Sequence, residues 1–328
     1  MDAKVGLVAI GRNEGDRLRR CLESAVGAVE QLVYVDSGST DGSPEMARSL
    51  GVDVVDLDLS VPFTAARSRN AGFARLQELL PEVEFVQFVD GDCEIAGGWL
   101  QLAVATLQEK QEVAVVCGRR RERFPEASPY NRLCDLEWDT PVGEALACGG
   151  DSMMRVSALS AVKGFNPSLI AGEEPELCLR LRQQDWKILR LDAEMTLHDA
   201  AMTRFGQWWK RMARAGHAFA EGAWLHGKTP ERYNVKETQR IWLWGAVIPA
   251  IALVSLWPSQ GWSLALLLVY PLMVLKVFMS QIRATVPSQD AALYALSCTI
   301  GKFPSIAGVL QFHANRLQGK RSQLIEYK

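Results

Sequence analysis

The sequence predicts an α/β fold, a Rossmann-like and mostly parallel sheet with helices on both faces, followed by C-terminal membrane helices. Apolar runs rich in Val and Ile alternate with stretches of helical spacing, which predicts the sheet. These runs end in polar or acidic residues, and ligands of parallel sheets bind at the carboxyl ends of the strands. The run from Ile241 to Leu275 lacks Asp, Glu, Lys and Arg, which predicts membrane helices.

The expected elements follow one another in a regular order. The strands are short apolar runs at 4–10, 32–35, 52–57, 85–89 and 113–117. The helices between them have apolar residues three and four apart, at 16–26, 44–50, 64–80 and 98–109. After Gly118 the pattern weakens, and we expect a charge-dense loop at 119–123, helices at 154–162 and 175–183, and a strand at 186–191.

Composition limits the possible partners and compartments. The chain of 328 residues has a net charge of −2, so no excess of charge indicates a nucleic-acid partner. The seven cysteines are odd in number and form no C-x-x-C pair, which indicates reduced thiols in a cytoplasmic setting. Residues 1–4 lead straight into a strand without an apolar signal segment, so we expect the first domain to stay in the cytoplasm.

The strongest chemical signal is the sequence Asp90-Gly91-Asp92 directly after an apolar strand. Two carboxylates so placed suit a hard divalent cation that also binds the oxygens of a diphosphate. The alternative interpretation is a solvated turn or a helix cap. The motif therefore predicts Mg²⁺ or Mn²⁺ as a cofactor.

Further candidate residues lie at the ends of other elements. Asp36 follows a strand and could accept a hydrogen bond from a base or a ribose. Arg69 opens a helix and could meet a phosphate, or be an exposed arginine on that helix. Glu173 and Glu174 begin a helix, where the dipole favours negative charge, and either could act as a general base, whereas Glu176 is expected on the helix surface.

The C-terminal third has the chemistry of a membrane-attached segment. Residues 204–223 would form a helix with one aromatic and one basic face, as interfacial helices have. Positive residues flank the charge-free run, which predicts a membrane hairpin at 241–279 with both ends in the cytoplasm. Residues 291–312 are read as a re-entrant or surface helix. The alternative for the apolar run is a buried helical hairpin in a soluble domain.

These pieces, in this order, resemble family 2 of the glycosyltransferases, which has the GT-A fold. The resemblance covers about 5–198 and is carried by motifs in register. The matching segments are 13–14, 35–42, 68–72, 90–92, 148–151, 164–165 and 172–174. Ser37 stands where the family usually has a second Asp, and Glu174 where it usually has Asp.

The resemblance implies roles for individual residues. Nucleotide binding would involve Asn13, Glu14, Asp36, Ser37, Arg69 and Asp90. Asp92, Asp90 and His198 would hold the metal, although a structural role for His198 is an equal alternative. Glu174, or Glu173, would be the catalytic base. The acceptor side would include Gly149, Gly150, Asp151, Trp208, Trp209 and Arg211.

The sequence thus predicts an inverting, metal-dependent hexosyltransferase of the inner membrane with a cytoplasmic catalytic domain. It would use a nucleoside diphosphate sugar, with UDP-sugars favoured, and a lipid-linked or saccharide acceptor in polysaccharide or glycolipid assembly. We expect the catalytic domain at 1–200, an interfacial region at 201–240 and a membrane region at 241–328. The alternatives are a polyprenyl-phosphate glycosyltransferase, a non-catalytic nucleotide-binding membrane module and, more distantly, a nucleotidyltransferase.

Overall fold

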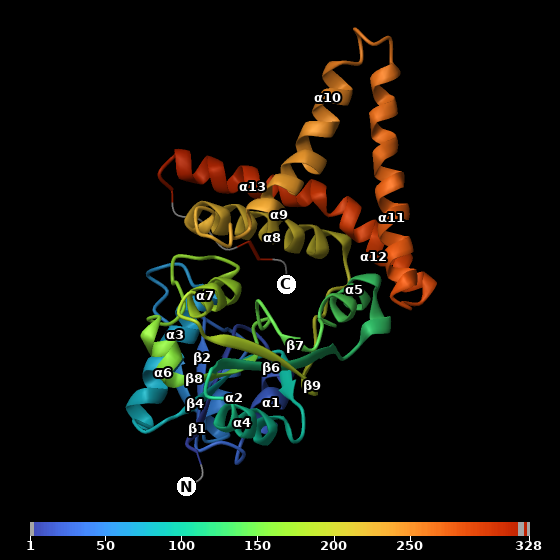
Figure 1. Ribbon diagram of the computed structural model, residues 1–328. Helices are drawn as coiled ribbons and strands as arrows, with labels where there is room; N and C mark the ends of the chain where they lie inside the picture. Colours follow the sequence, from blue (N-terminus) through green and yellow to red (C-terminus); the bar gives the residue numbers. More distant parts are fainter. Residues whose placement is uncertain (1–2, 321–324, 327–328) are drawn as a thin grey trace. The chain divides into compact units, whose positions relative to one another are not determined.

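The computed structural model describes residues 3–320 and 325–326 and divides the chain into two compact units. The first unit comprises Met1–Phe124 and Glu137–Ala200, and the second comprises Pro125–Leu136 and Ala201–Lys328. Figure 1 shows the elements of both units along the chain.

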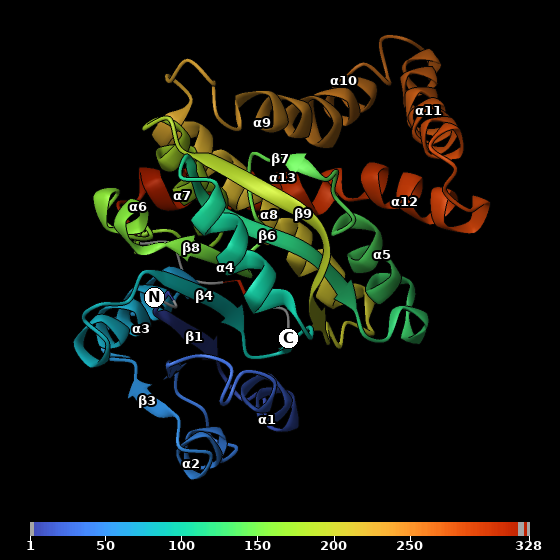
Figure 2. The same cartoon turned by 60° about the horizontal axis from the view of Figure 1, so that its bottom comes forward.

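The first unit is built on a nine-stranded mixed sheet. Its strands are β1 (Val5–Gly11), β2 (Gln31–Asp36), β3 (Asp53–Asp56), β4 (Phe85–Asp90), β5 (Cys93–Ile95), β6 (Val113–Glu122), β7 (Gly143–Glu144), β8 (Ser152–Arg155) and β9 (Lys187–His198). The order is β3-β2-β1-β4-β8-β6-β9-β5, and β7 pairs with β9. Figure 2 shows β1, β4, β8 and β6 in this succession.

Parallel pairing places strand ends together at one edge of the sheet. In the parallel pairs Ile10 lies opposite Val35 on one side and Asp90 on the other, so the carboxyl ends of β1, β2 and β4 coincide. β8 is antiparallel to both β4 and β6, whereas β6 and β9 are parallel. The prediction of an α/β sheet with flanking helices is confirmed, and the sheet is mixed, because β5, β7 and β8 pair antiparallel with their neighbours.

The helices of the first unit cover the sheet. They are α1 (Asp16–Glu23), α2 (Ser43–Ser49), α3 (Ala65–Leu79), α4 (Trp99–Glu109), α6 (Val156–Ala161) and α7 (Glu173–Arg182). Gly72 allows α3 to lie close to the sheet, because a Cβ atom there would come within 2.4 Å of the Val8 side chain. A core of fully buried aliphatic and aromatic side chains, including Leu7, Phe88 and Trp99, joins sheet and helices.

Two expectations for the middle of the chain are wrong. Residues 119–122 are not a loop, because β6 continues to Glu122 and pairs with β9. The helix expected at 154–162 begins only at Val156, since Met153 and Met154 lie in β8. Both methionines are buried between β4 and β6, so an apolar pair that fits a helix pattern fills a central strand instead.

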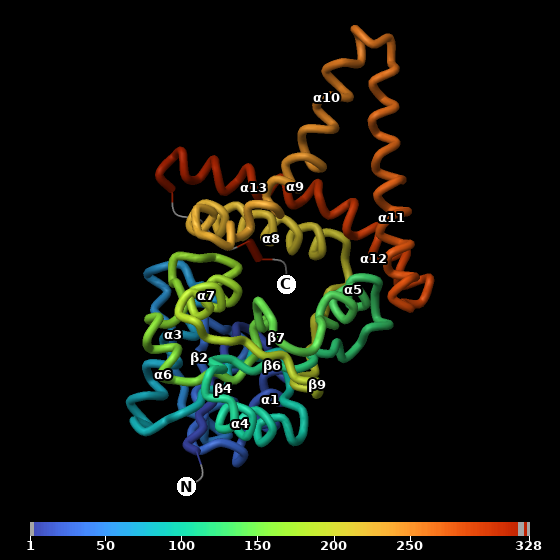
Figure 3. Tube along the Cα trace, in the orientation of Figure 1, coloured from blue at the N-terminus to red at the C-terminus, as the bar shows by residue number. Residues whose placement is uncertain are grey.

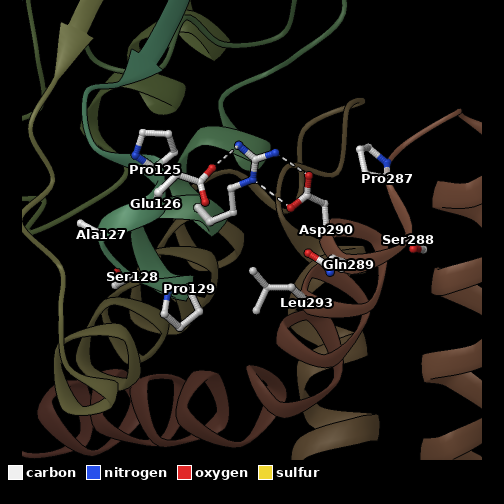
Figure 4. A pocket seen from close by; sticks show the side chains of 11 residues that line it. Pro125, Glu126, Ala127, Ser128, Pro129, Pro287, Ser288, Gln289, Asp290 and Leu293 are labelled. Atoms are coloured by element: carbon white, nitrogen blue, oxygen red, sulfur yellow. Dashed lines mark hydrogen bonds and ion pairs between the residues drawn. The ribbon is translucent and has the colours of Figure 1, made fainter.

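The second unit is helical. It contains the 3₁₀ turn η1 (Pro125–Ala127), α5 (Pro129–Glu137), α8 (Phe205–His226), α9 (Val235–Trp242), the π-helical η2 (Leu243–Val247), α10 (Ile248–Val254), the 3₁₀ turn η3 (Trp262–Leu268), α11 (Val269–Arg283), α12 (Ser288–Ile300) and α13 (Lys302–Leu317). Arg132 of α5 forms two hydrogen bonds with Asp290 of α12, of 2.8 and 2.5 Å. This ion pair lies in a pocket of about 650 Å³ (Figure 4).

The second unit contains a helical hairpin. It runs out along α10, turns at 255–261 and returns along η3 and α11 (Figure 3). Among the residues that the structure describes, two helices are long and apolar enough to cross a membrane. They are Trp262–Arg283, whose most apolar 18-residue window has no buried residue, and Ser288–Leu317, whose window is half buried. Trp257 and Trp262 beside the turn are 93% and 82% exposed. The second helix includes the segment 291–312, whose placement in a membrane stays a prediction.

Helices α8 and α13 approach each other backbone to backbone. A Cβ atom at Gly216 would lie 2.0 Å from the Ser305 carbonyl oxygen, and one at Gly308 would lie 1.8 Å from the Ala213 carbonyl oxygen. Small residues permit this approach, as at the interfaces of membrane helices.

We expect Gly308→Ala to destabilise the second unit by about 1–3 kcal/mol, because the added methyl group forces the helices apart. Denaturant unfolding in detergent, followed by tryptophan fluorescence, measures the change. Gly206→Ala in α8 is the control, since a Cβ atom there meets nothing within 4 Å. Equal stability of Gly308→Ala and wild type would show that the helices tolerate a wider separation.

Candidate active site

Two acidic residues lie where β4 ends at the edge of the sheet. Asp90 is its last residue, and Asp92 follows after Gly91. The Gly91 N–H donates a 2.8 Å hydrogen bond to the Ile10 carbonyl of β1, and a Cβ atom at Gly91 would lie only 3.1 Å from that oxygen. The glycine therefore lets the chain turn closely against β1, and the Asp92 side chain is buried.

The last residue of β9, His198, lies beside Asp92. Antiparallel pairing of β5 with β9 sets Cys93 opposite His198, and His198 Nε2 lies 3.3 Å from Asp92 Oδ2. Its Nδ1 lies 3.3 Å from Oε2 of the buried Glu122, and Trp138 packs edge-on with ring centroids 4.6 Å apart. Burial lowers the pKa of His198, which favours the neutral imidazole that metal ions bind.

This arrangement has the donor groups of a metal site. Ligand atoms of Asp92, Cys93 and His198 all lie within 4.8 Å of one another. A carboxylate such as Glu122 on the far ring nitrogen is the usual outer partner of a metal-binding histidine. The residues therefore fit the Mg²⁺ or Mn²⁺ predicted from the sequence, and the imidazole suits Mn²⁺ better.

Two arginines hold Asp90 from opposite sides. Arg69 of α3 donates to Asp90 Oδ1 at 2.7 Å and to Glu173 Oε1 at 2.5 Å. Arg120 of β6 donates to Asp90 Oδ2 at 2.8 Å and to Asp151 Oδ2 at 2.9 Å. Burial alone would raise the pKa of Asp90, but the two guanidinium groups hold it well below its usual range. Asp90 is therefore a carboxylate, and Arg69 is not the exposed helix residue of the alternative interpretation.

Asp151 is hydrogen-bonded to two residues of this cluster, Asp90 and Arg120. Its Oδ1 accepts the backbone N–H of Asp90 at 3.0 Å, and its Oδ2 accepts the Thr196 hydroxyl at 2.8 Å in addition to Arg120. The side chain is completely buried, so both oxygens are engaged by the protein. These contacts fix the positions of Asp90 and Arg120. The acceptor-side role of Asp151 stays a prediction. Gly149 and Gly150 precede it with φ angles of 84° and 101°, which glycine adopts without strain.

The loop after β2 is ordered by Asp36. Its Oδ2 accepts the N–H groups of Gly38 and Ser39, and its Oδ1 accepts the Tyr34 hydroxyl at 2.8 Å. Asn13 contacts the same loop, because its backbone N–H donates a 2.8 Å hydrogen bond to the Ser39 hydroxyl oxygen. Asp36 thus shapes a polar loop at the carboxyl end of β2.

The remaining residues predicted to bind nucleotide lie at neighbouring strand ends. The Ser37 hydroxyl lies 3.1 Å from that of Ser68 in α3, and Glu14 forms a 2.7 Å ion pair with Arg17. All six predicted nucleotide-binding residues therefore occupy the carboxyl-end edge of β1, β2 and β4 or the first turns of α3. Their contacts with a nucleotide stay a prediction.

The carboxylates at the start of α7 have different surroundings. Glu173 pairs with Arg69 and so belongs to the Asp90 cluster. Glu174 Oε1 accepts the Cys148 N–H at 2.5 Å and lies 2.9 and 3.0 Å from the sulfurs of Cys148 and Cys178. Glu176 is buried and accepts two 3.0 Å hydrogen bonds from Arg180, so its expected place on the helix surface is wrong.

The predicted acceptor-side residues of α8 belong to the second unit. Trp208 is buried and stacks on Tyr130, with ring centroids 6.4 Å apart. Trp209 is 37% exposed and packs against Phe205. The contacts of Trp208, Trp209 and Arg211 with an acceptor stay a prediction.

Sequence reasoning missed several residues of the site. Arg120, Glu122, Thr196 and Trp138 were not singled out, although each contacts a predicted residue. Arg120 and Glu122 lie in the charged run 119–123, which has no apolar alternation that would indicate a strand. The others are set by strand pairing between β6 and β9, which has no local signature.

The sheet order and the acids at its edge agree with the GT-A fold expected from the sequence. Residues 8–159, slightly less than half of the chain, match the family model described as Glycosyl transferase family 2. The fold of this chain is similar to that of the mannosyltransferase PcManGT from Pyrobaculum calidifontis in complex with GDP-Man and Mn²⁺, with a TM-score of 0.59, 18% identity, and 95% of this chain and 88% of that chain covered. It is also similar to S. aureus TarS 1-349, with a TM-score of 0.51, 15% identity, and 97% and 92% covered.

Two curated proteins are similar in sequence. A TPR repeat-containing protein of Synechococcus elongatus is 29% identical over 140 residues, which are 42% of this chain and 32% of that protein. The chain thus matches about a third of that protein's length. Glycosyltransferase AglE of Haloferax volcanii is 22% identical over 217 residues, which are 62% of this chain and 69% of AglE.

Proposed function

We propose that this protein transfers one sugar from a nucleoside diphosphate donor to a hydroxyl group of a lipid-linked acceptor, with inversion at the anomeric carbon. The proposal rests on the close approach of Asp92 and His198, whose Oδ2 and Nε2 atoms lie 3.3 Å apart. Asp90 lies two residues before Asp92 and is hydrogen-bonded to Arg69 and Arg120. The match of residues 8–159 to the family 2 glycosyltransferase model supports sugar transfer. PcManGT, which shares the fold, binds GDP-Man and Mn²⁺, so GDP-sugars are donor candidates beside the UDP-sugars favoured from the sequence.

Asp92 and His198 would hold the divalent cation, with Asp90 on the ribose and metal side. When bound, the cation supplies positive charge that stabilises the departing nucleoside diphosphate. Arg69 and Arg120 keep Asp90 ionised and fixed in position. Asp36 and Asn13 would present their loop to the base or ribose of the donor.

Glu174 is proposed as the base that takes the proton of the acceptor hydroxyl. Its hydrogen bonds with Cys148 and Cys178 all involve Oε1, which fixes the carboxylate and leaves Oε2 for the acceptor. Glu173 Oε1 is instead engaged by Arg69, so Glu173 is proposed to orient that arginine. Glu174 is one methylene longer than the Asp that the resembled family usually has at this position. The hydrogen bonds of its Oε1 hold the longer side chain in place.

A lipid-linked acceptor is supported by the apolar hairpin of the second unit. Leu253, Val254, Trp257 and Leu272 expose between 63% and 93% of their surfaces. Soluble proteins rarely expose such a continuous apolar surface. We propose that the hairpin and α8, with its exposed Trp209, attach the enzyme to the cytoplasmic face of the inner membrane.

A screen of nucleotide sugars tests the proposal. The full chain, purified in detergent, is assayed for donor hydrolysis with Mn²⁺ or Mg²⁺ and then for transfer to extracted lipids. We expect one nucleotide sugar to be consumed and a glycosylated polyprenyl diphosphate lipid to be formed. Mass analysis distinguishes the rival reaction, because transfer onto polyprenyl phosphate leaves a single phosphate. Transfer to soluble acceptors alone would contradict the lipid-linked acceptor, and binding without turnover would indicate a non-catalytic module.

We expect Leu253→Asp combined with Leu272→Asp to move the protein from the membrane fraction to the soluble or aggregated fraction. Each aspartate costs about 2.5–3.5 kcal/mol at the centre of a membrane helix. Flotation of cell membranes on a density gradient measures the distribution. Leu102→Asp, at a 43% exposed position of α4, is the control and should float like wild type. Unchanged flotation of the hairpin variant would contradict membrane insertion of the hairpin.

A further inference from the structure

Two buried cysteines enclose one oxygen of Glu174. Glu174 and Cys178 are four residues apart in α7 and therefore lie on one face of the helix. Cys148 comes from the loop before β8, and its sulfur lies 3.9 Å from that of Cys178. All three side chains are buried. Buried cysteines usually act as small apolar side chains, but these two point at a carboxylate.

We propose that Cys148, Cys178 and Glu174 form a binding site for a soft divalent cation, with Zn²⁺ as its occupant. This site differs from the Asp92–His198 site in chemistry, because sulfur ligands select Zn²⁺ over Mg²⁺ and Mn²⁺. The ligand atoms of the three residues lie within 4.8 Å of one another.

The spacing of the sulfurs matches a tetrahedral zinc site. Two thiolates about 2.3 Å from a tetrahedral Zn²⁺ lie about 3.8 Å apart, compared with the 3.9 Å between Cys148 and Cys178. A carboxylate oxygen about 2.0 Å from the ion would lie about 3.5 Å from each sulfur, compared with 2.9 and 3.0 Å in the thiol form. Glu174 therefore has to move by about half an ångström as Zn²⁺ takes the place of the two thiol protons.

The surroundings provide a fourth ligand. The Ser152 hydroxyl oxygen lies 3.3 Å from Cys148 Sγ, so this oxygen or a water molecule can complete four-coordination. Burial and the Glu174 carboxylate raise the pKa of Cys148, and the hydrogen bond with Cys148, burial and Glu174 raise the pKa of Cys178. Each sulfur therefore releases a proton to solvent when it binds the metal.

Occupation of this site would remove the base from catalysis. This consequence rests on the proposed function, since it requires Glu174 to take the acceptor proton. Zn²⁺ bound to Oε1 withdraws negative charge from the carboxylate and makes Oε2 a weaker base, so Zn²⁺ would inhibit sugar transfer while the donor still binds. The binding itself does not depend on transferase activity.

The test is a titration of the reduced, metal-free full chain with Cd²⁺, whose bonds to thiolates absorb in the ultraviolet. It is performed in a His198→Ala background, because Asp92, Cys93 and His198 also group their ligand atoms. We expect one Cd²⁺ per chain and a charge-transfer band. Cys148→Ser and Cys178→Ser should each weaken binding on the order of 100-fold and reduce the band. Cys298→Ser, at the partly exposed cysteine, should leave both unchanged.

A band of equal strength in both serine variants would overturn the proposal. If a serine variant does not fold, thiol labelling of the wild-type chain decides the question. Zn²⁺ should then protect Cys148 and Cys178, identified by mass spectrometry, from a maleimide under mildly denaturing conditions, and unprotected labelling would overturn the site. In transfer assays, Zn²⁺ should inhibit wild type more strongly than the Cys178→Ser variant. Cadmium binding without any transferase activity would leave the site standing and reject only the proposed function.

Discussion

Asp92→Asn should lower sugar transfer by about 1,000-fold or more while the protein keeps its fold. The substitution preserves the shape of the side chain but removes the negative charge that faces His198 at 3.3 Å. Loss of one preorganised electrostatic group at the reacting diphosphate typically costs a factor of about 10²–10³, and loss of a metal ligand adds to this. The measurement is kcat for donor hydrolysis and transfer at saturating Mn²⁺, with circular dichroism as the check on folding.

Asp58→Asn is the matched control for this variant. Asp58 is exposed in the loop after β3. Its carboxylate accepts hydrogen bonds from the backbone N–H and the hydroxyl of Ser60. It should turn over donor like wild type. Activity of Asp92→Asn within tenfold of wild type would refute the placement of the cation at this aspartate.

Glu174→Gln should lower transfer by about 10²–10⁴-fold, because an amide cannot take the proton of the acceptor hydroxyl. The amide keeps nearly the same volume, and its oxygen can still accept the Cys148 N–H. Donor binding should be preserved, since the partners of Glu174 are in α7 and the Cys148 loop rather than in the Asp90 cluster. Calorimetric titration with the donor and a transfer assay separate binding from turnover.

Glu173→Gln is the comparison for the base assignment. It removes the charge that faces Arg69 but leaves Glu174 in place. We expect weaker donor binding and a smaller loss of kcat than in Glu174→Gln. The reverse order of kcat values would assign the proton transfer to Glu173.

Much of the fold could be predicted because local pattern determines its first half. The strands of β1 to β4 and their helices are regular alternations of apolar runs and helical spacing, which place Asp90 and Asp92 at a strand end. β5, β7 and β8 were missed because they are short, at three, two and four residues, and gain their stability from pairing with longer strands.

The candidate site was predictable where motifs are contiguous. Asp90, Asp92, Arg69 and Glu173 lie in short motifs, and Arg69 indeed contacts Asp90 and Glu173. Arg120 could not be recognised, since its role depends on the pairing of β6 with β9 and β8 far along the chain. The two sulfurs around Glu174 likewise come together only through the packing of α7 against the Cys148 loop.

The pairing of two arginines with three acids has a consequence for the order in which ligands enter. Arg69 and Arg120 are fully shared among Asp90, Asp151 and Glu173, so the guanidinium groups leave an excess of negative charge even before Asp92 is counted. A bare nucleoside diphosphate would be repelled there, whereas a divalent cation would be attracted. We therefore expect calorimetry to show tight nucleotide binding only when Mn²⁺ or Mg²⁺ is present, with the cation entering first or together with the nucleotide.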